Sequence, residues 1–466
     1  MFSGRYGYHR DELYFLAAGH HLAWGYPDQP PFVPALARLM SAVAPGSLPV
    51  LRLPSAFAVA GVVLLTARLA REMGAGRGAR TLAALAMATC PVLFGSGHLL
   101  STTTFGLLAW AAALLLVVHI LRTRRDRLFV PLGVVVGIGL MDNDLIAFLM
   151  AGLVVGVLIA GPRDSFRSPW LGLGTVIAAA MWTPYIVWQA RNGWPQLDVA
   201  RSIASGGSGT SEPRWALVPF QLIMGNLWLT PIWVVGLVQL LRRQELRWAR
   251  AVGWCWIALV VAFTALGGKP YYLSGMLPVL FAAGAQPSLD WARRSASRFR
   301  ALVVGGTISA LIPLPITLPL VPVSALHDTP IVDLNYDAGE TVGWPTYVRE
   351  ITTMVHRAES GGTNGVVLLA SNYGEAGAIE RYGHVTAYSG DMGFWWWGPP
   401  PDGQSTVVAV GYDGNYLRKF FERCTFGTRL DNHLDLDDDE QGQPVYACSG
   451  QRSDWSAMWP DFKQVG

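Results

Sequence analysis

The chain has 466 residues, of which 52% are hydrophobic and only 14% are charged, and its mean hydropathy is +0.32. This composition excludes an ordinary soluble domain and indicates a polytopic membrane protein. Most of the basic residues lie in connections between apolar segments, so the net charge of +3 implies no nucleic-acid partner.

A charged segment opens the chain. It reads YHRDELYF at residues 8–15 and is followed by GYPDQPP at residues 25–31. Residues 10–24 and 31–43 mix apolar and polar positions at near-helical spacing, and they are too polar to cross a membrane. We therefore expect two helices that lie along the membrane surface and roof a cavity.

Apolar windows long enough to span a bilayer follow this segment. We predict about ten membrane spans, over residues 51–69, 79–98, 105–121, 128–141, 145–160, 170–188, 215–241, 251–266, 271–285 and 301–323. Arginines cluster after the first, third, fifth, seventh and ninth of these windows. Because arginine-rich loops stay cytoplasmic, the charged N-terminal segment and everything after residue 323 are expected outside.

This orientation predicts a multi-pass protein of the plasma membrane whose N-terminus is exported. No signal peptide or apolar helix precedes the charged segment in the sequence. Either a further membrane helix is encoded upstream of Met1, or the short tail crosses the membrane without one.

The sequence changes character after residue 323. Residues 365–370 and 406–410 have the composition of strands, and residues 375–382 and 416–424 are predicted helical. We therefore divide the chain into a membrane domain at residues 1–323, which includes an external loop at residues 1–50, and an external α/β domain at residues 324–466. Cys424 and Cys448 both fall in the external domain, where an oxidising compartment permits a disulfide.

The two N-terminal segments resemble the first external loop of the GT-C glycosyltransferases, the superfamily of protein O-mannosyltransferases and aminoarabinose transferases. Further segments resemble its bacterial, family 39-like branch: GKPYY at 268–272, WQARNGWP at 188–195, ETVGWP at 340–345, NYGEA at 372–376 and WWWGPP at 395–400. The resemblance implies an α-helical polytopic membrane enzyme that moves a sugar from a polyprenyl-phosphate donor to a hydroxyl group of a lipid, glycan or protein outside the cell.

The resemblance also implies roles for individual residues. Asp11 matches the position of the catalytic acid, which makes it the candidate general base, with Glu12 as its support or as a metal ligand. The alternative is that both acids only complement a helix N-terminus. The donor phosphate is expected to contact Arg10, Lys269, Tyr271 and Tyr272. A lysine and tyrosines at a membrane surface can also be plain interface anchors.

Four more polar residues are candidates for the substrate cavity. Asp28 and Gln29 belong to the second half of the resembling loop, and Asp142 and Asp144 lie at the outer end of a predicted span, where a buried carboxylate is costly and therefore a candidate for function. A solvated turn is the alternative for the last two. The run DLDDDE at residues 435–440 lacks the glycine of a calcium loop and is predicted to be a solvated surface segment.

One departure from the family pattern affects the choice of mechanism. Superfamily members usually carry a second acid in the next external loop, where this chain has Gly106. No cofactor is therefore certain, and the need for a divalent metal stays open. A catalytically degenerate relative and a transporter or lipid flippase are the alternatives, although no internal repeat supports the transporter.

Overall fold

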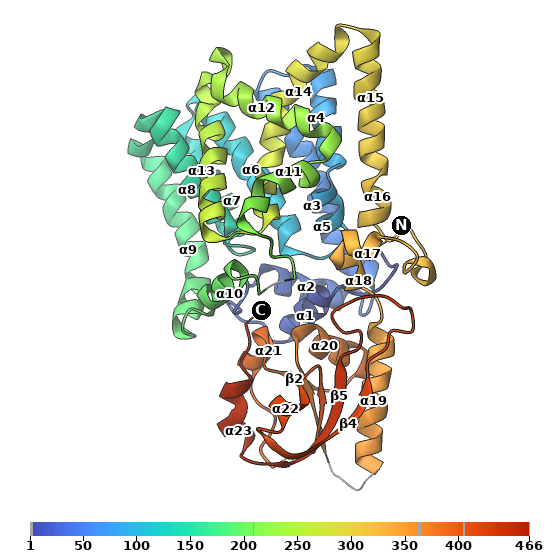
Figure 1. The fold of residues 1–466 in the computed structure, drawn as a ribbon. Coiled ribbons are helices and arrows are strands. Elements are labelled where there is room, and N and C mark those ends of the chain that lie inside the picture. Colours follow the sequence, from blue (N-terminus) through green and yellow to red (C-terminus); the bar gives the residue numbers. More distant parts are fainter. Residues whose placement is uncertain (1–2, 208, 361–364, 404–405, 466) are drawn as a thin grey trace.

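The computed structural model describes residues 3–207, 209–360, 365–403 and 406–465. A bundle of apolar helices forms one end of the molecule and a small α/β domain forms the other (Figure 1). Helices α1 (Arg10–His20) and α2 (Phe32–Val43) lie between these two parts. The predicted surface helices are thus confirmed, each ending within four residues of its expected bounds.

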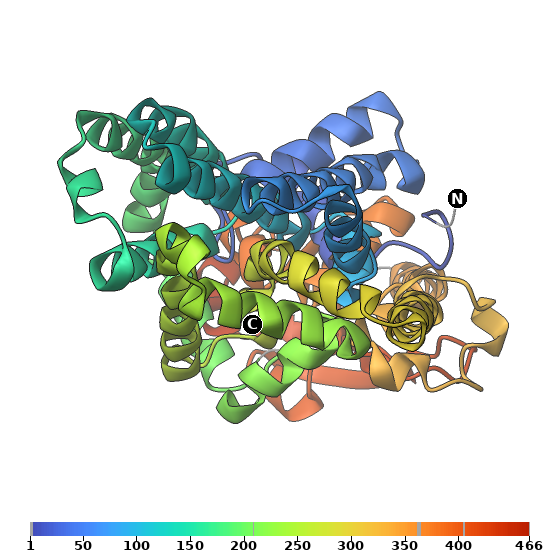
Figure 2. The same cartoon turned by 90° about the horizontal axis from the view of Figure 1, so that it is seen from above.

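The bundle is built from helices that follow one another in chain order. They are α3 (Leu48–Glu72), α4 (Arg77–Ala88), α5 (Pro91–Gly97), α6 (Thr102–Thr123), α7 (Phe129–Leu140), α8 (Leu145–Ala160), α9 (Pro169–Arg191), α10 (Pro195–Ala204), α11 (Leu217–Met224), α12 (Thr230–Arg242), α13 (Arg250–Leu266), α14 (Leu277–Arg293), α15 (Ala296–Leu311) and α16 (Pro313–Thr317). Viewed from above, the α/β domain lies beneath them (Figure 2).

Small residues let neighbouring helices approach closely. A Cβ atom added to Gly133 of α7 would lie 2.1 Å from the carbonyl oxygen of Gly174 on α9. A Cβ atom added to Gly236 of α12 would lie 1.9 Å from the Leu280 carbonyl oxygen on α14. Side chains larger than hydrogen would therefore push these helix pairs apart.

Within the described residues, five helices are long and apolar enough to cross a membrane, and the number rises to seven if each of two bent pairs counts as one span. The sequence predicts about ten, and the difference comes from predicted windows that fold as shorter or broken helices. Residues 79–98 form α4 and α5, which meet at 58°. Pro91 causes this break, because proline cannot donate a backbone hydrogen bond and forces the preceding residue out of the helical region.

The arginine-rich turns lie at one end of the bundle. The turns between α12 and α13 and between α14 and α15 are at the end away from the α/β domain (Figure 1). Their arginines include Arg242, Arg243, Arg293 and Arg294. The basic turns and the α/β domain are thus on opposite sides of the apolar helices.

The α/β domain contains a five-stranded sheet of order β2-β1-β3-β5-β4. Its strands are β1 (Val366–Ala370), β2 (Ala387–Ser389), β3 (Thr406–Val410), β4 (Phe421–Arg429) and β5 (Pro444–Gln451). Strands β1, β2 and β3 are parallel, whereas β5 runs antiparallel to both β3 and β4. The two strands predicted from the sequence are β1 and β3.

The remaining elements of this domain surround the sheet. They are α17 (Ile331–Leu334), α18 (Tyr336–Gly339), α19 (Trp344–Ser360), α20 (Tyr373–Ala378), the π-helical turn η8 (Ile379–Gly383), α21 (Met392–Trp397), α22 (Gly414–Leu417) and α23 (Trp455–Met458). The predicted helix over residues 416–424 is wrong in its second half, since residues from Phe421 onward pair with β5. Strand pairing between distant segments overrides local helical preference here.

Candidate active site

Asp11 lies in the first turn of α1, at the boundary between the helical bundle and the α/β domain. His9 caps this helix by accepting a hydrogen bond from the Asp11 backbone N–H through Nδ1 at 3.2 Å. The Asp11 side chain is 45% exposed, and its Oδ1 accepts a hydrogen bond from the Tyr373 hydroxyl at 2.9 Å. Tyr373 begins α20, so the α/β domain positions the candidate base.

Glu12 has a different environment, although it is the next residue. Its carboxylate is fully buried and accepts two hydrogen bonds from Arg52 of α3, at 2.8 and 2.7 Å. The backbone N–H groups of Leu100 and His9 donate to the same carboxylate, each at 2.9 Å. Burial acts to raise the pKa of Glu12, but the charge and hydrogen bonds of Arg52 outweigh it and lower the pKa. Both oxygens are thus already used in joining α1 to the bundle.

Arg10 faces the α/β domain. Its guanidinium donates to the Tyr336 hydroxyl at 2.9 Å and to Glu340 Oε2 at 3.2 Å, and it also pairs with Asp439. The same group stacks over the Tyr373 ring at 5.0 Å. Arg10 is among the residues that line the large cavity described below, and its bonds to Tyr336, Glu340 and Asp439 all come from one terminal nitrogen of the guanidinium.

The predicted solvated run at residues 435–440 is wrong for several of its members. Leu436 and Glu440 are buried, and Asp438 accepts a hydrogen bond from the Tyr347 hydroxyl at 2.8 Å. Together with the pairing of Arg10 and Asp439, these contacts show that the acids bind groups of other segments. The sequence predicts a solvated segment because the residues that bind these acids are far away in the chain.

The polar part of the site contains two basic groups, His9 and Lys269, and two carboxylates, Asp11 and Asp337. His9 Nε2 lies 3.5 Å from Oδ1 of Asp337, a residue of α18. Burial alone would lower the pKa of His9, but the carboxylates of Asp337, Asp11 and Glu12 raise it to about 9. Burial lowers the pKa of Lys269, and the charges of Asp11 and Asp337 oppose this shift. Lys269 is therefore placed within the electrostatic reach of both acids.

Asp28 and Gln29 lie next to this group. Asp28 Oδ1 accepts a hydrogen bond from the Tyr14 hydroxyl at 2.8 Å. Burial raises the pKa of Asp28 to about 7; the hydrogen bond from Tyr14 opposes the shift, and the nearby charges of Asp11 and Asp391 add to it. Gln29 is buried, and neither of its amide atoms has a hydrogen-bond partner among the described residues.

A cavity of about 1800 Å³ connects these residues with the membrane helices. Its polar end is lined by His9, Asp11, Asp28, Lys269, Asp337 and Asp391. Its apolar part is lined by Phe220 and Ile223 of α11, Leu227 and Trp228 of the turn that follows it, Ile312 between α15 and α16, and Ile316 of α16. The cavity therefore fits a ligand that has a charged group at one end and a long apolar chain.

The structure brings most of the predicted site residues together. Arg10, Asp11, Asp28, Gln29, Asp144, Lys269, Tyr271 and Tyr272 line the cavity, whereas Glu12 and Asp142 lie outside its lining. Asp144 accepts hydrogen bonds from Trp182 and Tyr185 at 3.2 and 3.3 Å. Asp142 is buried, and its Oδ2 lies 3.6 Å from the place of a Cβ atom at Gly106.

Sequence reasoning missed Asp337, Asp391 and the role of Tyr373. Tyr373 belongs to the NYGEA segment, which carried a family resemblance, so a signal for it existed. Asp337 and Asp391 lie outside the segments that resemble the family, and both are more than 300 residues after Asp11 in the chain. The tertiary structure alone brings them to the cavity.

The described residues do not form a ready metal centre. Within the described ranges, no three side chains of His, Cys, Asp or Glu gather at a distance that would hold a metal ion. Glu12 accepts hydrogen bonds from Arg52 and from backbone groups, and the raised pKa of Asp28 reduces the share of the carboxylate form that a metal ion would need.

Comparisons with known proteins agree with this architecture. The family model for dolichyl-phosphate-mannose-protein mannosyltransferase matches residues 28–188, which is less than half of the chain. No curated protein matches the chain.

Solved structures extend the comparison over almost the whole chain. The crystal structure of ArnT from Cupriavidus metallidurans bound to undecaprenyl phosphate matches with a TM-score of 0.61 at 14% identity, covering 96% of this chain and 93% of that one. The apo state of the same protein matches with a TM-score of 0.58 over the same shares. An oligosaccharyltransferase from Archaeoglobus fulgidus gives a TM-score of 0.42 at 17% identity, covering 83% and 61% of the two chains.

The fold, with its apolar helical bundle, surface helices and C-terminal α/β domain, is thus similar to that of ArnT. Residues 28–188 in addition match the mannosyltransferase family model, so the partial family match and the similarity of fold point to the same group of membrane proteins.

Proposed function

We propose that the protein transfers a sugar from a polyprenyl-phosphate donor to a hydroxyl group of a lipid, glycan or protein acceptor. The observation that carries this proposal is the cavity that joins Asp11 and Lys269 to an apolar channel among membrane helices. A lipid phosphate matches both ends of such a cavity. ArnT from Cupriavidus metallidurans was crystallised with undecaprenyl phosphate bound, which supports the same class of donor here.

In the proposed reaction, Asp11 is the general base. One Asp11 oxygen accepts from Tyr373, and the other takes the proton of the acceptor hydroxyl. The hydroxyl oxygen then bonds to the anomeric carbon with inversion, the bond from this carbon to the phosphate oxygen breaks, and the lipid phosphate leaves with the electron pair. Positive charge on Lys269, with His9 nearby, stabilises the leaving phosphate.

We further propose that the site and the α/β domain face the outside of the cell. The arginine-rich turns lie at the opposite end of the bundle, and such turns remain in the cytoplasm. The disulfide between Cys424 and Cys448 in the α/β domain is consistent with an oxidising compartment.

The test is single-turnover transfer from a labelled polyprenyl-phosphate sugar by the purified protein. Asp11→Asn should lower the transfer rate by about 100-fold or more, because the amide cannot accept the proton. Donor binding should change little, and folding should persist because the Asn side-chain oxygen can still accept from Tyr373. The matched control is Asp198→Asn, a similarly exposed acid on α10 that pairs only with Arg201 among the described residues.

Wild-type transfer by Asp11→Asn would refute the base assignment. Absence of transfer by the wild type from every polyprenyl-phosphate sugar tried would instead favour the transporter, flippase or degenerate-relative alternatives. Lipid analysis of a deletion strain separates these cases, since loss of a transferase leaves its donor to accumulate.

A further inference from the structure

A second cavity, of about 470 Å³, lies on the other side of α1 from the candidate active site. Asp11 and Tyr14 line the large cavity, whereas Leu16, Ala17 and His20 line the second one. Its floor comes from α2 and the loop that follows, and its opposite wall comes from η8 and residues 384–386 of the α/β domain. It is therefore a separate space between the two parts of the molecule, and neither the predicted site residues nor the proposed reaction use it.

Arg381 is the central polar group of this wall. Its guanidinium lies over the rings of Tyr8 and Tyr382, at 5.3 and 5.7 Å. In the part of the chain that the structure describes, it has no hydrogen-bond or ion-pair partner. Stacking on two rings fixes the orientation of the guanidinium while leaving its N–H donors available.

The backbone beside Arg381 leaves room for this arrangement. Gly46 has a φ of +76°, and a Cβ atom there would lie 2.9 Å from a terminal nitrogen of Arg381. Glycine satisfies both requirements, since it tolerates a left-handed backbone and has no side chain to displace the guanidinium.

The charges around the cavity favour an anion. His20 and His384 line it with Arg381, and the Arg38 guanidinium lies 2.9 Å from His20 Nδ1. Glu380 is the acid of this wall. Burial raises its pKa to about 7, against the effect of a hydrogen bond from the Ala387 backbone N–H, so a large share of Glu380 is protonated at neutral pH. Arg381 therefore supplies a fixed positive charge to the cavity, and His20 and His384 add polar ring nitrogens to its lining.

The surroundings also favour an amphiphile. Met40 and Ser41 of α2 line the cavity together with Ala44, which follows the helix, while Leu39 and Val43 of α2 are 55% and 65% exposed. Leu53 and Phe57, near the start of α3, are also exposed. Because α3 is one of the helices apolar enough to cross the membrane, this edge of the cavity lies where the bundle meets the lipid surface.

We propose that this cavity binds the phosphate-bearing headgroup of an anionic lipid from the leaflet next to the α/β domain, with Arg381 as the main contact. The acyl chains lie along the exposed apolar residues of α2 and α3. Such a lipid joins the membrane surface to the α/β domain independently of the reaction proposed above.

The experiment measures lipid binding to the full-length protein in mild detergent by native mass spectrometry, with phosphatidylglycerol and phosphatidylcholine as probes. The wild type should retain phosphatidylglycerol preferentially. Arg381→Ala should weaken the tightest phosphatidylglycerol binding by about tenfold, because a charge-assisted hydrogen bond is lost. The control Arg349→Ala removes an exposed arginine of α19, away from the cavity, and should bind like the wild type.

Ser41→Trp provides a second variant, because it fills the cavity from α2 without removing the stacked arginine, and it should cause the same loss. Thermal unfolding of each variant checks that it is folded. Wild-type phosphatidylglycerol binding by folded Ser41→Trp or Arg381→Ala overturns the proposal. Displacement of the lipid by millimolar inorganic phosphate would also overturn it, since the site would then take a soluble phosphate.

Discussion

Asp11 and Glu12 show how two adjacent acids acquire different roles. Successive residues of a helix point in directions about 100° apart, so one turn of α1 directs Asp11 to the large cavity and Glu12 to α3. Arg52 decides the outcome, because its buried guanidinium needs a carboxylate partner.

The pairing of Glu12 predicts an effect on folding. Glu12→Gln should destabilise the protein by about 3 to 5 kcal/mol, because Arg52 would remain buried without its countercharge. Thermal unfolding in detergent measures this loss, with Asp11→Asn as the neighbouring control that should unfold like the wild type. Normal unfolding together with lost transfer would instead support the predicted catalytic role of Glu12.

Asp28 predicts a pH-dependent contribution to stability. Its pKa is higher in the folded protein, about 7, than the ordinary value of 3.8. Folding therefore takes up a proton between these values, and the wild type loses stability as the pH rises from about 4 to about 7. Asp28→Asn removes this dependence and keeps an acceptor for Tyr14.

Unfolding temperatures across this pH range provide the measurement. The Asn variant should match the wild type near pH 4 and become progressively more stable than it towards pH 7. A constant difference over the whole range would show that Asp28 ionises normally in the folded protein.

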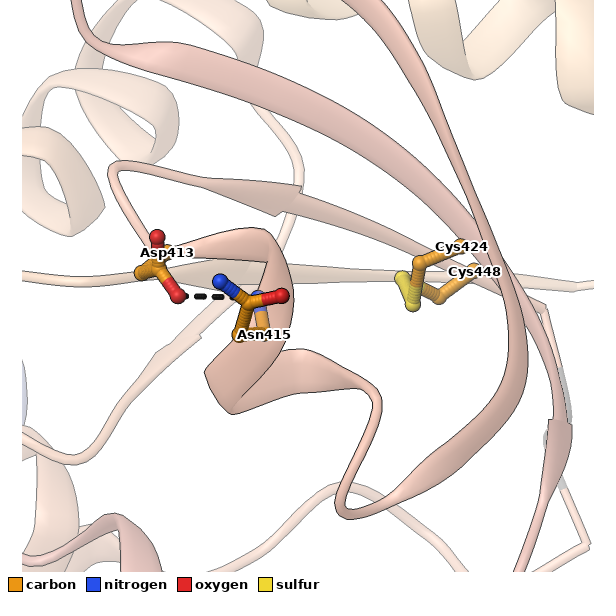
Figure 3. The surroundings of a disulfide bond; sticks show 4 residues. All are labelled: Asp413, Asn415, Cys424 and Cys448. Atoms are coloured by element: carbon orange, nitrogen blue, oxygen red, sulfur yellow. Dashed lines mark hydrogen bonds between the residues drawn. A yellow bond between two sulfur atoms is a disulfide. The ribbon is translucent and has the colours of Figure 1, made fainter.

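At the scale of elements, the α/β domain depends on contacts between distant strands. Cys424 of β4 and Cys448 of β5 are paired directly across the sheet and form a disulfide (Figure 3). The sequence allowed this bond but placed Cys424 at the end of a helix. Strand β4 is at the edge of the sheet and has a partner strand on only one side. Most of its residues are exposed, so its sequence lacks the alternation of apolar and polar residues that predicts a strand.

Removal of the disulfide should loosen this edge. The bond closes a segment of 24 residues, and a link over such a loop stabilises a protein by roughly 3 kcal/mol. The double variant Cys424→Ser/Cys448→Ser should therefore be cut faster within residues 421–451 in limited proteolysis, as should the reduced wild type. The control variant Cys90→Ser/Cys255→Ser lacks the two cysteines of the helical bundle and keeps the disulfide. Reductant should still accelerate its cleavage, which would show that reductant acts through the Cys424–Cys448 bond.

At the scale of the whole molecule, the cavity combines segments from across the chain. Its charged end is made by the N-terminal segment, the connection at Lys269 and the α/β domain, and its apolar part is made by the bundle. A substitution in either the charged end or the apolar part of the cavity should then weaken the binding of a lipid phosphate.

One substitution at each end tests this. Lys269→Ala should weaken binding of a polyprenyl-phosphate sugar by roughly 10- to 100-fold through loss of a contact to the phosphate worth about 1.5 to 3 kcal/mol. Ile223→Trp should weaken it by narrowing the apolar channel. Val176→Trp is the matched control, since Val176 is exposed on α9 outside the cavity. Equal binding by all three variants would show that the donor does not occupy this cavity.

The sequence by itself determined the membrane class and the two surface helices, and it supplied the predictions of a boundary near residue 323 and of Asp11 as the base. These features depend on composition, local periodicity and short motifs, which are properties of neighbouring residues. The tertiary structure alone decided that Glu12 pairs with Arg52, that residues 421–424 form a strand, and that Asp337 and Asp391 join the site. Each of these depends on partners tens to hundreds of residues away, whose approach is set by burial and backbone pairing and leaves no local pattern.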